Sequence, residues 1–250
     1  MEAARADGAE PEARESQGGF RVRDIIRFIA ADIVISLAVG LFRMAGFFSS
    51  ADAFITAVLG GKLVLFAYLA WLIGEHRESW RETGALTLGR PLGWLLALVT
   101  YGLAYPLLEA ADSLNQAWLA MAYEWLGLAY RPAGQEVMQY IFSDALGRPL
   151  RLILLFFVIL AGPCLEEMAF RGMGLDAFRR AGGALGALVW TSLLFGMFHF
   201  SPSIFLPLSL LGLVFGLARM LSGSLWCGLT LHSLHNALTL FLAARALGWL

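Results

Sequence analysis

The chain has 250 residues, a formal net charge of −1, and a composition that is 59% hydrophobic and 15% charged. Soluble globular domains are about 45–50% apolar and about 25% charged, so this composition excludes a water-soluble domain. The near-neutral charge gives no reason to expect a nucleic-acid partner. Long apolar runs without alternation predict an all-α, polytopic transmembrane helical bundle in the lipid bilayer and argue against a transmembrane barrel.

Residues 1–19 are polar, charged and rich in Ala, Gly and Glu, and we expect a disordered N-terminal tail there. The first apolar run follows Arg21, Arg23 and Arg27 and is long enough to span a membrane. We therefore interpret it as an uncleaved anchor, with cleavage near residues 50–53 as the alternative.

About seven membrane spans are predicted, with boundaries set to within a few residues. These expected spans cover 28–48, 52–74, 91–111, 150–171, 184–200, 204–221 and 225–247. The first carries Asp32 and the second carries Lys62, and the fourth is expected to continue as a helix to about residue 180.

A longer connection is expected at residues 112–149. Within it, the segment AWLAMAYEWLGLAY (117–130) is too short and too aromatic for an ordinary span. It predicts a short interfacial or re-entrant helix.

Arginines cluster before the first span, between the second and third, and after the fourth, all of which fall on one side of a seven-span bundle. Positive residues favour the cytoplasmic side, so we expect a multi-pass protein with a cytoplasmic N-terminus. The Ala- and Arg-rich character of the chain favours a bacterial plasma membrane. We divide the chain into N-terminal transmembrane helices, 20–149, and a C-terminal helical core, 150–247.

The fourth span contains two adjacent glutamates, Glu166 and Glu167, followed by Arg171. Ionisable residues inside a membrane span are costly and are functional candidates by default. Glu167 and Arg171 are spaced i,i+4 in the favourable order for an ion pair. Neighbouring residues point about 100° apart on a helix, so we expect Glu166 to be the freer carboxylate and to act as a general base on water. The plainer reading is that both glutamates are structural partners of Arg171.

The fifth span carries His199 near its end. Gly182 and Gly183 predict a turn between the fourth and fifth spans. Glu166 lies 16 residues before Gly182 and His199 lies 16 residues after Gly183. An antiparallel hairpin would therefore bring both side chains to one depth, about 24 Å from the turn at about 1.5 Å per residue.

The last span carries His232 and Asn236 on one helical face, with His235 on a partly overlapping face. Such side chains can simply hold helices together, but three in five residues exceed what packing needs. The depth of His232 matches that of Glu166 only if this helix is tilted or begins higher.

These groups suit hydrolysis by an activated water. Glu166 would take the proton, and Asn236 could donate a hydrogen bond to an oxyanion. His199 and His232 could either position the water and the oxyanion or bind a metal with Glu166. A divalent metal such as zinc accepts these ligands, and the sequence leaves both choices open.

At these residues the chain resembles the CPBP family of intramembrane proteases, which includes the type II CAAX prenyl endopeptidases and the ABI proteins. The family motifs EExxxR, FxxxH and HxxxN correspond to residues 166–171, 195–199 and 232–236. The resemblance covers roughly residues 150–245 and implies an all-helical CAAX-protease-like (metallo)endopeptidase. It implies catalytic roles for Glu166, Glu167, Arg171, His199, His232 and Asn236.

The resemblance also implies a membrane-associated protein or peptide as substrate. Both a metalloprotease mechanism and a metal-free glutamate mechanism are argued for the family. Eukaryotic members act on prenylated proteins, whereas the Ala- and Arg-rich character of this chain is typical of bacteria, so the substrate stays open.

Two other functions stay open. One is a non-catalytic membrane scaffold or regulator of the same fold. The other is a proton-coupled transporter in which Glu166 and the histidines form a relay. Transport predicts internal repeat symmetry, which the sequence does not show.

Overall fold

The computed structural model of the chain describes residues 19–85, 87–131 and 136–249, and the regular elements of these residues are all helical. The fold is therefore all-α, as predicted. The predicted disordered tail lies outside the described residues except for Gly19, which is buried.

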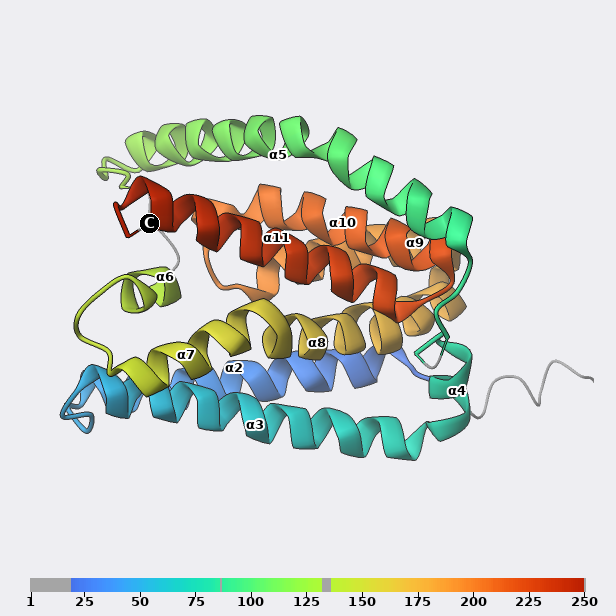
Figure 1. Ribbon diagram of the computed structural model, residues 1–250, viewed down its shortest axis with the longest axis horizontal. Coiled ribbons are helices and arrows are strands. Elements are labelled where there is room, and N and C mark those ends of the chain that lie inside the picture. The colour runs from blue at the N-terminus through green and yellow to red at the C-terminus, as the bar shows by residue number, and fades with distance from the viewer. Residues whose placement is uncertain (1–18, 86, 132–135, 250) are drawn as a thin grey trace, which may run out of the picture.

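The long helices of the bundle lie side by side, joined by short turns and short helices (Figure 1). They are α2 (Val22–Met44), α3 (Ala51–Glu75), α5 (Pro91–Trp125), α9 (Leu175–Phe198), α10 (Phe205–Ser222) and α11 (Leu225–Ala246). The shorter elements are α4 (Arg77–Glu82), α6 (Glu136–Ile141), α7 (Arg148–Phe156), the π-helix η1 (Phe157–Ala161), α8 (Gly162–Glu167), the π-helix η2 (Met168–Gly174) and the 3₁₀ turn η3 (Pro202–Ile204).

Five helical segments are long and apolar enough to cross a membrane. They are Val22–Met44, Ala51–Glu75, Pro91–Trp125, Arg148–Phe198 and Pro202–Ser222. The chain is an integral membrane protein on this evidence. Helix α11 is not among the five, because its histidines, asparagine and serine lower its hydropathy.

The segment Arg148–Phe198 contains the predicted hairpin. The backbone leaves helical geometry at Gly182 and Gly183, and Gly183 has a φ of 76°, which favours glycine. Gly174 and Thr191, equally far from this turn, lie so close that a Cβ on Gly174 would be 3.5 Å from Cγ2 of Thr191. The predicted fourth and fifth spans are therefore the two antiparallel arms of one hairpin.

The predicted interfacial helix at 117–130 is wrong. Residues up to Trp125 continue α5, which is a single helix of 35 residues. The polar residues that suggested a connection instead bind the start of α10. The Asn115 side chain donates to the carbonyl of Pro202 at 2.9 Å, and the Gln116 side chain donates to the carbonyl of Ser203 at 2.8 Å.

In Figure 1, α5 runs along one edge of the bundle and α2 and α3 run along the opposite edge. Helices α10 and α11 and the α7–η2 segment lie between these edges. The main core gathers apolar side chains from both edges and from the helices between them. A smaller core joins α3, α6, α7 and α11.

Helices α9 and α10 approach closely because glycines face their contact. A Cβ on Gly212 would lie 3.0 Å from Cα of Ser192, and one on Gly196 would lie 2.8 Å from the carbonyl oxygen of Phe205. Small residues at such positions are typical of helix pairs in membranes. This contact holds the second arm of the hairpin against α10.

Helices α2 and α3 are joined by an ion pair inside their apolar spans. The Lys62 ammonium donates to Oδ1 of Asp32 at 2.6 Å, and the Asp32 side chain is 2% exposed. The Lys62 Nζ atom also lies 5.3 Å from the centre of the Phe198 ring. The pair therefore links the N-terminal helices to the hairpin.

Replacing Lys62 by Met is expected to lower the free energy of unfolding by about 3 kcal/mol, because the buried Asp32 carboxylate loses its counter-ion. The double variant Asp32→Asn/Lys62→Met is expected to lose less. Unfolding of the purified protein in a denaturing detergent measures both. Equal losses in the two variants would contradict the isolated-charge explanation.

Candidate active site

The two glutamates occupy α8, a short α-helical segment between the π-helices η1 and η2. Pro163 lies near the start of α8 and has no N–H. It therefore cannot donate the π-helical hydrogen bond to the carbonyl of Val158, five residues earlier. The Asn236 amide fills this place by donating to the Val158 oxygen at 2.8 Å. Helix α11 is thereby attached to the chain directly before the glutamates.

Glu167 and Arg171 form the predicted ion pair. Arg171 Nη1 lies 3.1 Å from Oε1 of Glu167, and both side chains are almost completely buried. Arg171 also donates from Nη2 to the carbonyl of Gly212 on α10 at 2.9 Å. Its guanidinium carbon lies 4.4 Å from the centre of the Phe195 ring, which is a cation–π distance. The guanidinium of Arg171 therefore contacts a carboxylate, a carbonyl and an aromatic face.

His232 reaches the same carboxylate from α11. Its Nδ1 atom lies 3.0 Å from Oε1 of Glu167. A carboxylate paired with Arg171 is an acceptor, so Nδ1 of His232 carries the hydrogen. The Nε2 atom of the same ring faces Glu166. The imidazole ring stacks on Phe215, with ring centres 4.7 Å apart and planes at 20°. Ring orientation and tautomer are both fixed by these contacts.

His199 ends the second arm of the hairpin and is oriented in a similar way. Its Nδ1 atom lies 2.9 Å from the carbonyl oxygen of Phe195, which can only accept a hydrogen bond. Nδ1 of His199 therefore carries the hydrogen, and Nε2 faces Glu166. The next residue, Phe200, has a φ of 49°, a left-handed conformation that is uncommon outside glycine. This turn ends α9 directly after the histidine.

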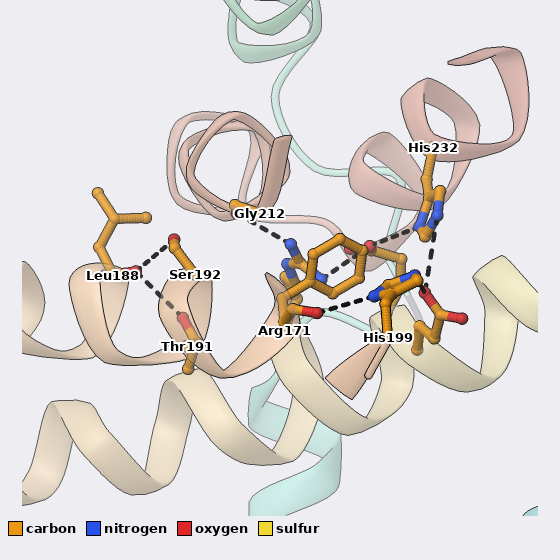
Figure 2. A network of polar contacts seen from close by, with 10 residues as sticks. Arg171, Leu188, Thr191, Ser192, His199, Gly212 and His232 are labelled. Carbon is orange, nitrogen blue, oxygen red and sulfur yellow. Dashed lines mark hydrogen bonds and ion pairs between the residues drawn. The ribbon is translucent and has the colours of Figure 1, made fainter. Parts of the chain in front are cut away.

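Figure 2 shows His199 and His232 approaching one another from separate helices, with Arg171 beside them. Oε2 of Glu166 lies 3.9 Å from Nε2 of His199 and 3.8 Å from Nε2 of His232. No side chain donates a hydrogen bond to this oxygen among the described residues. Glu166 is therefore the carboxylate that is held least, as the helical spacing predicts.

Glu166, His199, His232 and Asn236 line one cavity, which His235 also faces. A second cavity, towards α2 and α3, is also lined by Glu166, His199 and Asn236, together with Asp32 and Lys62. Two hollows thus meet at Glu166. The structure brings together five of the six predicted site residues by direct contacts, and places Asn236 in the same cavity walls.

The donor set bears on the expected metal. Two imidazole Nε2 atoms and a carboxylate are ligands that zinc accepts. Among the described residues, however, no group of three or more His, Cys, Asp and Glu is arranged to hold a metal ion. The separations of 3.8 and 3.9 Å between Oε2 of Glu166 and the two Nε2 atoms are somewhat longer than the roughly 3.4 Å between neighbouring ligands of a tetrahedral zinc ion.

Sequence reasoning missed three contributors to the site. Phe215 stacks on His232, and the Gly212 carbonyl accepts from Arg171. Gly228, one turn before His232, leaves room for the Glu167 carboxylate, since a Cβ there would lie 2.8 Å from Oε2. Of these three, only Gly228 could have been suspected from the sequence, because it lies four residues before His232 on the same helical face.

His235 also gains a partner that the sequence did not indicate. Its Nδ1 atom lies 3.1 Å from the hydroxyl of Tyr101 on α5, and the two rings meet edge to face. His235 thus connects the cavity wall to the long edge helix.

A family model matches the part of the chain that carries these residues. Residues 148–238 match the family described as type II CAAX prenyl endopeptidase, Rce1-like. The match includes all three motifs and confirms the resemblance over these residues. It supports a protease that acts on a substrate in the membrane. Comparisons with curated proteins and with solved structures gave no match.

Replacing Gly228 by Ala is expected to lower the free energy of unfolding by about 1–3 kcal/mol, because the added methyl group displaces Glu167 from Arg171 and His232. The matched control is Gly102→Ala in α5, where no atom lies within 4 Å of the added Cβ. There the same change should stabilise the helix by about 0.5–1 kcal/mol. Thermal unfolding of both variants gives the comparison, and a stabilised Gly228→Ala would contradict the crowding.

Proposed function

From the CAAX-endopeptidase-like domain at residues 148–238, we propose that this chain is an intramembrane endopeptidase. It hydrolyses a peptide bond of a membrane-associated protein or peptide, with water activated by Glu166. The observation that supports this most directly is the contrast between the two glutamates. Oε1 of Glu167 is paired with Arg171 and His232, whereas within the described part of the chain Oε2 of Glu166 has no hydrogen-bond donor and lies near two histidines in a cavity wall.

In the proposed mechanism, Glu166 is the general base. A water molecule beside Oε2 gives a proton to the carboxylate as its oxygen attacks the peptide carbonyl. The same proton then passes from Glu166 to the leaving nitrogen as the tetrahedral intermediate breaks down. The carboxylate is restored and both products leave.

The histidines position the water in this mechanism. Because Nδ1 of each ring carries the hydrogen, Nε2 of the neutral imidazole is an acceptor. Either His199 or His232 can therefore accept the second hydrogen of the water while Glu166 takes the first. Holding the reactants in this way removes much of the entropic cost of the reaction.

Asn236 is the proposed donor to the developing oxyanion. One of its two N–H hydrogens is bound by the Val158 carbonyl, which fixes the amide in place. The other remains for a substrate oxygen in the cavity that Asn236 shares with Glu166. A preorganised donor of this kind contributes most when water is excluded.

The cavity towards α2 and α3 is the proposed place for the substrate. It offers about 910 Å³ of empty space, its open mouth included, and is lined largely by apolar side chains beside Glu166. A peptide segment in this cavity would have its carbonyl next to the base.

Replacing Glu166 by Gln is expected to abolish cleavage of a membrane-peptide panel, by about a thousandfold or more, because the amide cannot accept the proton. His199→Ala and Asn236→Ala should each lower the rate by about a hundredfold. Product peptides identified by mass spectrometry give the readout. Trp190→Ala, on a lipid-facing position, is the control. Full cleavage activity of the Glu166→Gln variant would contradict the role of Glu166 as the base. A parent protein that cleaves no peptide of the panel would point instead to a scaffold.

A metal-assisted form, with a divalent ion such as zinc held by Glu166, His199 and His232, is the alternative version of this proposal. Because these side chains are not arranged as a closed ligand set, we expect cleavage to survive prolonged dialysis against a chelator. The measurement is the cleavage rate before and after dialysis. Loss of activity that is restored by zinc alone would establish the metal-assisted form.

A further inference from the structure

A third cavity lies at the end of the bundle that carries α4 and the hairpin turn, and it has no part in the proposed hydrolysis. It offers about 900 Å³ of empty space, open solvent at its mouth included. Its charged lining residues are Glu82, Arg90, Arg171, Asp176, Arg179 and Arg219. Four arginines therefore face two carboxylates.

Both carboxylates already form ion pairs, with Arg179 or Arg180. Asp176 lies 3.6 Å from Arg179 and 3.0 Å from Arg180, and Glu82 lies 3.6 Å from Arg180. Within the described residues no ion pair joins Arg90 or Arg219 to a carboxylate. The cavity thus keeps a surplus of positive charge, contributed by these two side chains.

The arginine nitrogens inside this cavity are incompletely bonded. Nε of Arg219 and Nε of Arg171 are both buried, and no described residue forms a hydrogen bond with either atom. The Arg171 side chain is 1% exposed, so this donor cannot turn to bulk water. Buried guanidinium donors without acceptors are costly, which is the pattern expected of a site that takes an anionic ligand.

The backbone around the cavity holds Arg90 and Arg219 in place. The loop before α5 docks on the α10–α11 turn, where the Arg90 N–H donates to the Ser222 carbonyl at 2.8 Å. Gly84 and Gly89 have φ values of 73° and 69°, and a Cβ on either would overlap that turn. A Cβ on Gly84 would also lie 3.5 Å from Cζ of Arg219, so the guanidinium packs over this loop.

We propose that this cavity binds a phosphate group, held by Arg90 and Arg219 with Arg179 at its edge. Planar guanidinium groups match phosphate oxygens in pairs, and basic cavities between the ends of membrane helices suit anionic lipid headgroups. The phosphate comes either from such a headgroup or from the aqueous phase. The site does not depend on the proposed hydrolysis.

The experiment measures binding to the purified full-length protein in a neutral detergent. Three probes are titrated separately: short-chain phosphatidylglycerol, short-chain phosphatidylcholine and inorganic phosphate. The test variant is Arg90→Gln/Arg219→Gln. The matched control is Arg23→Gln/Arg27→Gln, which removes two charges from largely exposed side chains at the same end of the bundle. Circular dichroism and the unliganded melting temperature check that each variant is folded.

The parent protein and the control should bind phosphatidylglycerol at least about tenfold more tightly than the test variant does, because two charge-assisted contacts are lost. Phosphatidylcholine should bind weakly to all three proteins. Comparable binding of inorganic phosphate would assign the aqueous source, and its absence would assign the lipid. The proposal is overturned if neither anionic probe binds, or if the control variant loses as much affinity as the test variant. A test variant that does not fold is replaced by Arg90→Lys/Arg219→Lys, which should weaken binding while keeping the charge.

Discussion

The buried ion pair of Glu167 and Arg171 is the interaction on which the rest of the core depends. A charge in this apolar interior is tolerated only with a partner and with further hydrogen bonds. Arg171 obtains these from Gly212 on α10, and Glu167 obtains them from His232 on α11. Figure 2 shows this convergence of separate helices on one small region. The need to satisfy two charges thus fixes how the hairpin, α10 and α11 pack.

The same pairing separates the roles of two chemically identical neighbours. Glu167 points to Arg171 and His232 and acts as a positioning residue, because it orients the imidazole of His232. Glu166, one residue earlier, projects from a different face of α8, where its Oε2 atom meets two Nε2 atoms at 3.8 and 3.9 Å. Helix α8 lies between two π-helices, and π-helical turns are frequent at functional sites. One helix therefore carries both the structural charge and the proposed base.

Much of this could be predicted from sequence because it depends on local spacing. The i,i+4 ion pair and the hairpin symmetry about Gly182 and Gly183 are both local, and the structure has both. The continuous α5 could not be predicted, since the partner of Asn115 lies 87 residues away. For the same reason, the contact of His232 with Glu167, across 65 residues, was outside the reach of helical periodicity. The same contact shows that His232 lies at the depth of the glutamates, which residue spacing alone did not establish.

The account predicts that Glu166 faces a water-filled cavity inside an otherwise apolar bundle. Labelling of an introduced thiol tests this most directly, in a background with Cys164 and Cys227 replaced by Ala. The thiol of Glu166→Cys should react readily with a small, charged, water-soluble methanethiosulfonate reagent. The thiol of Trp190→Cys, on the lipid-facing side of α9, should stay unlabelled. An unreactive thiol at position 166, or equal labelling at both positions, would contradict the account.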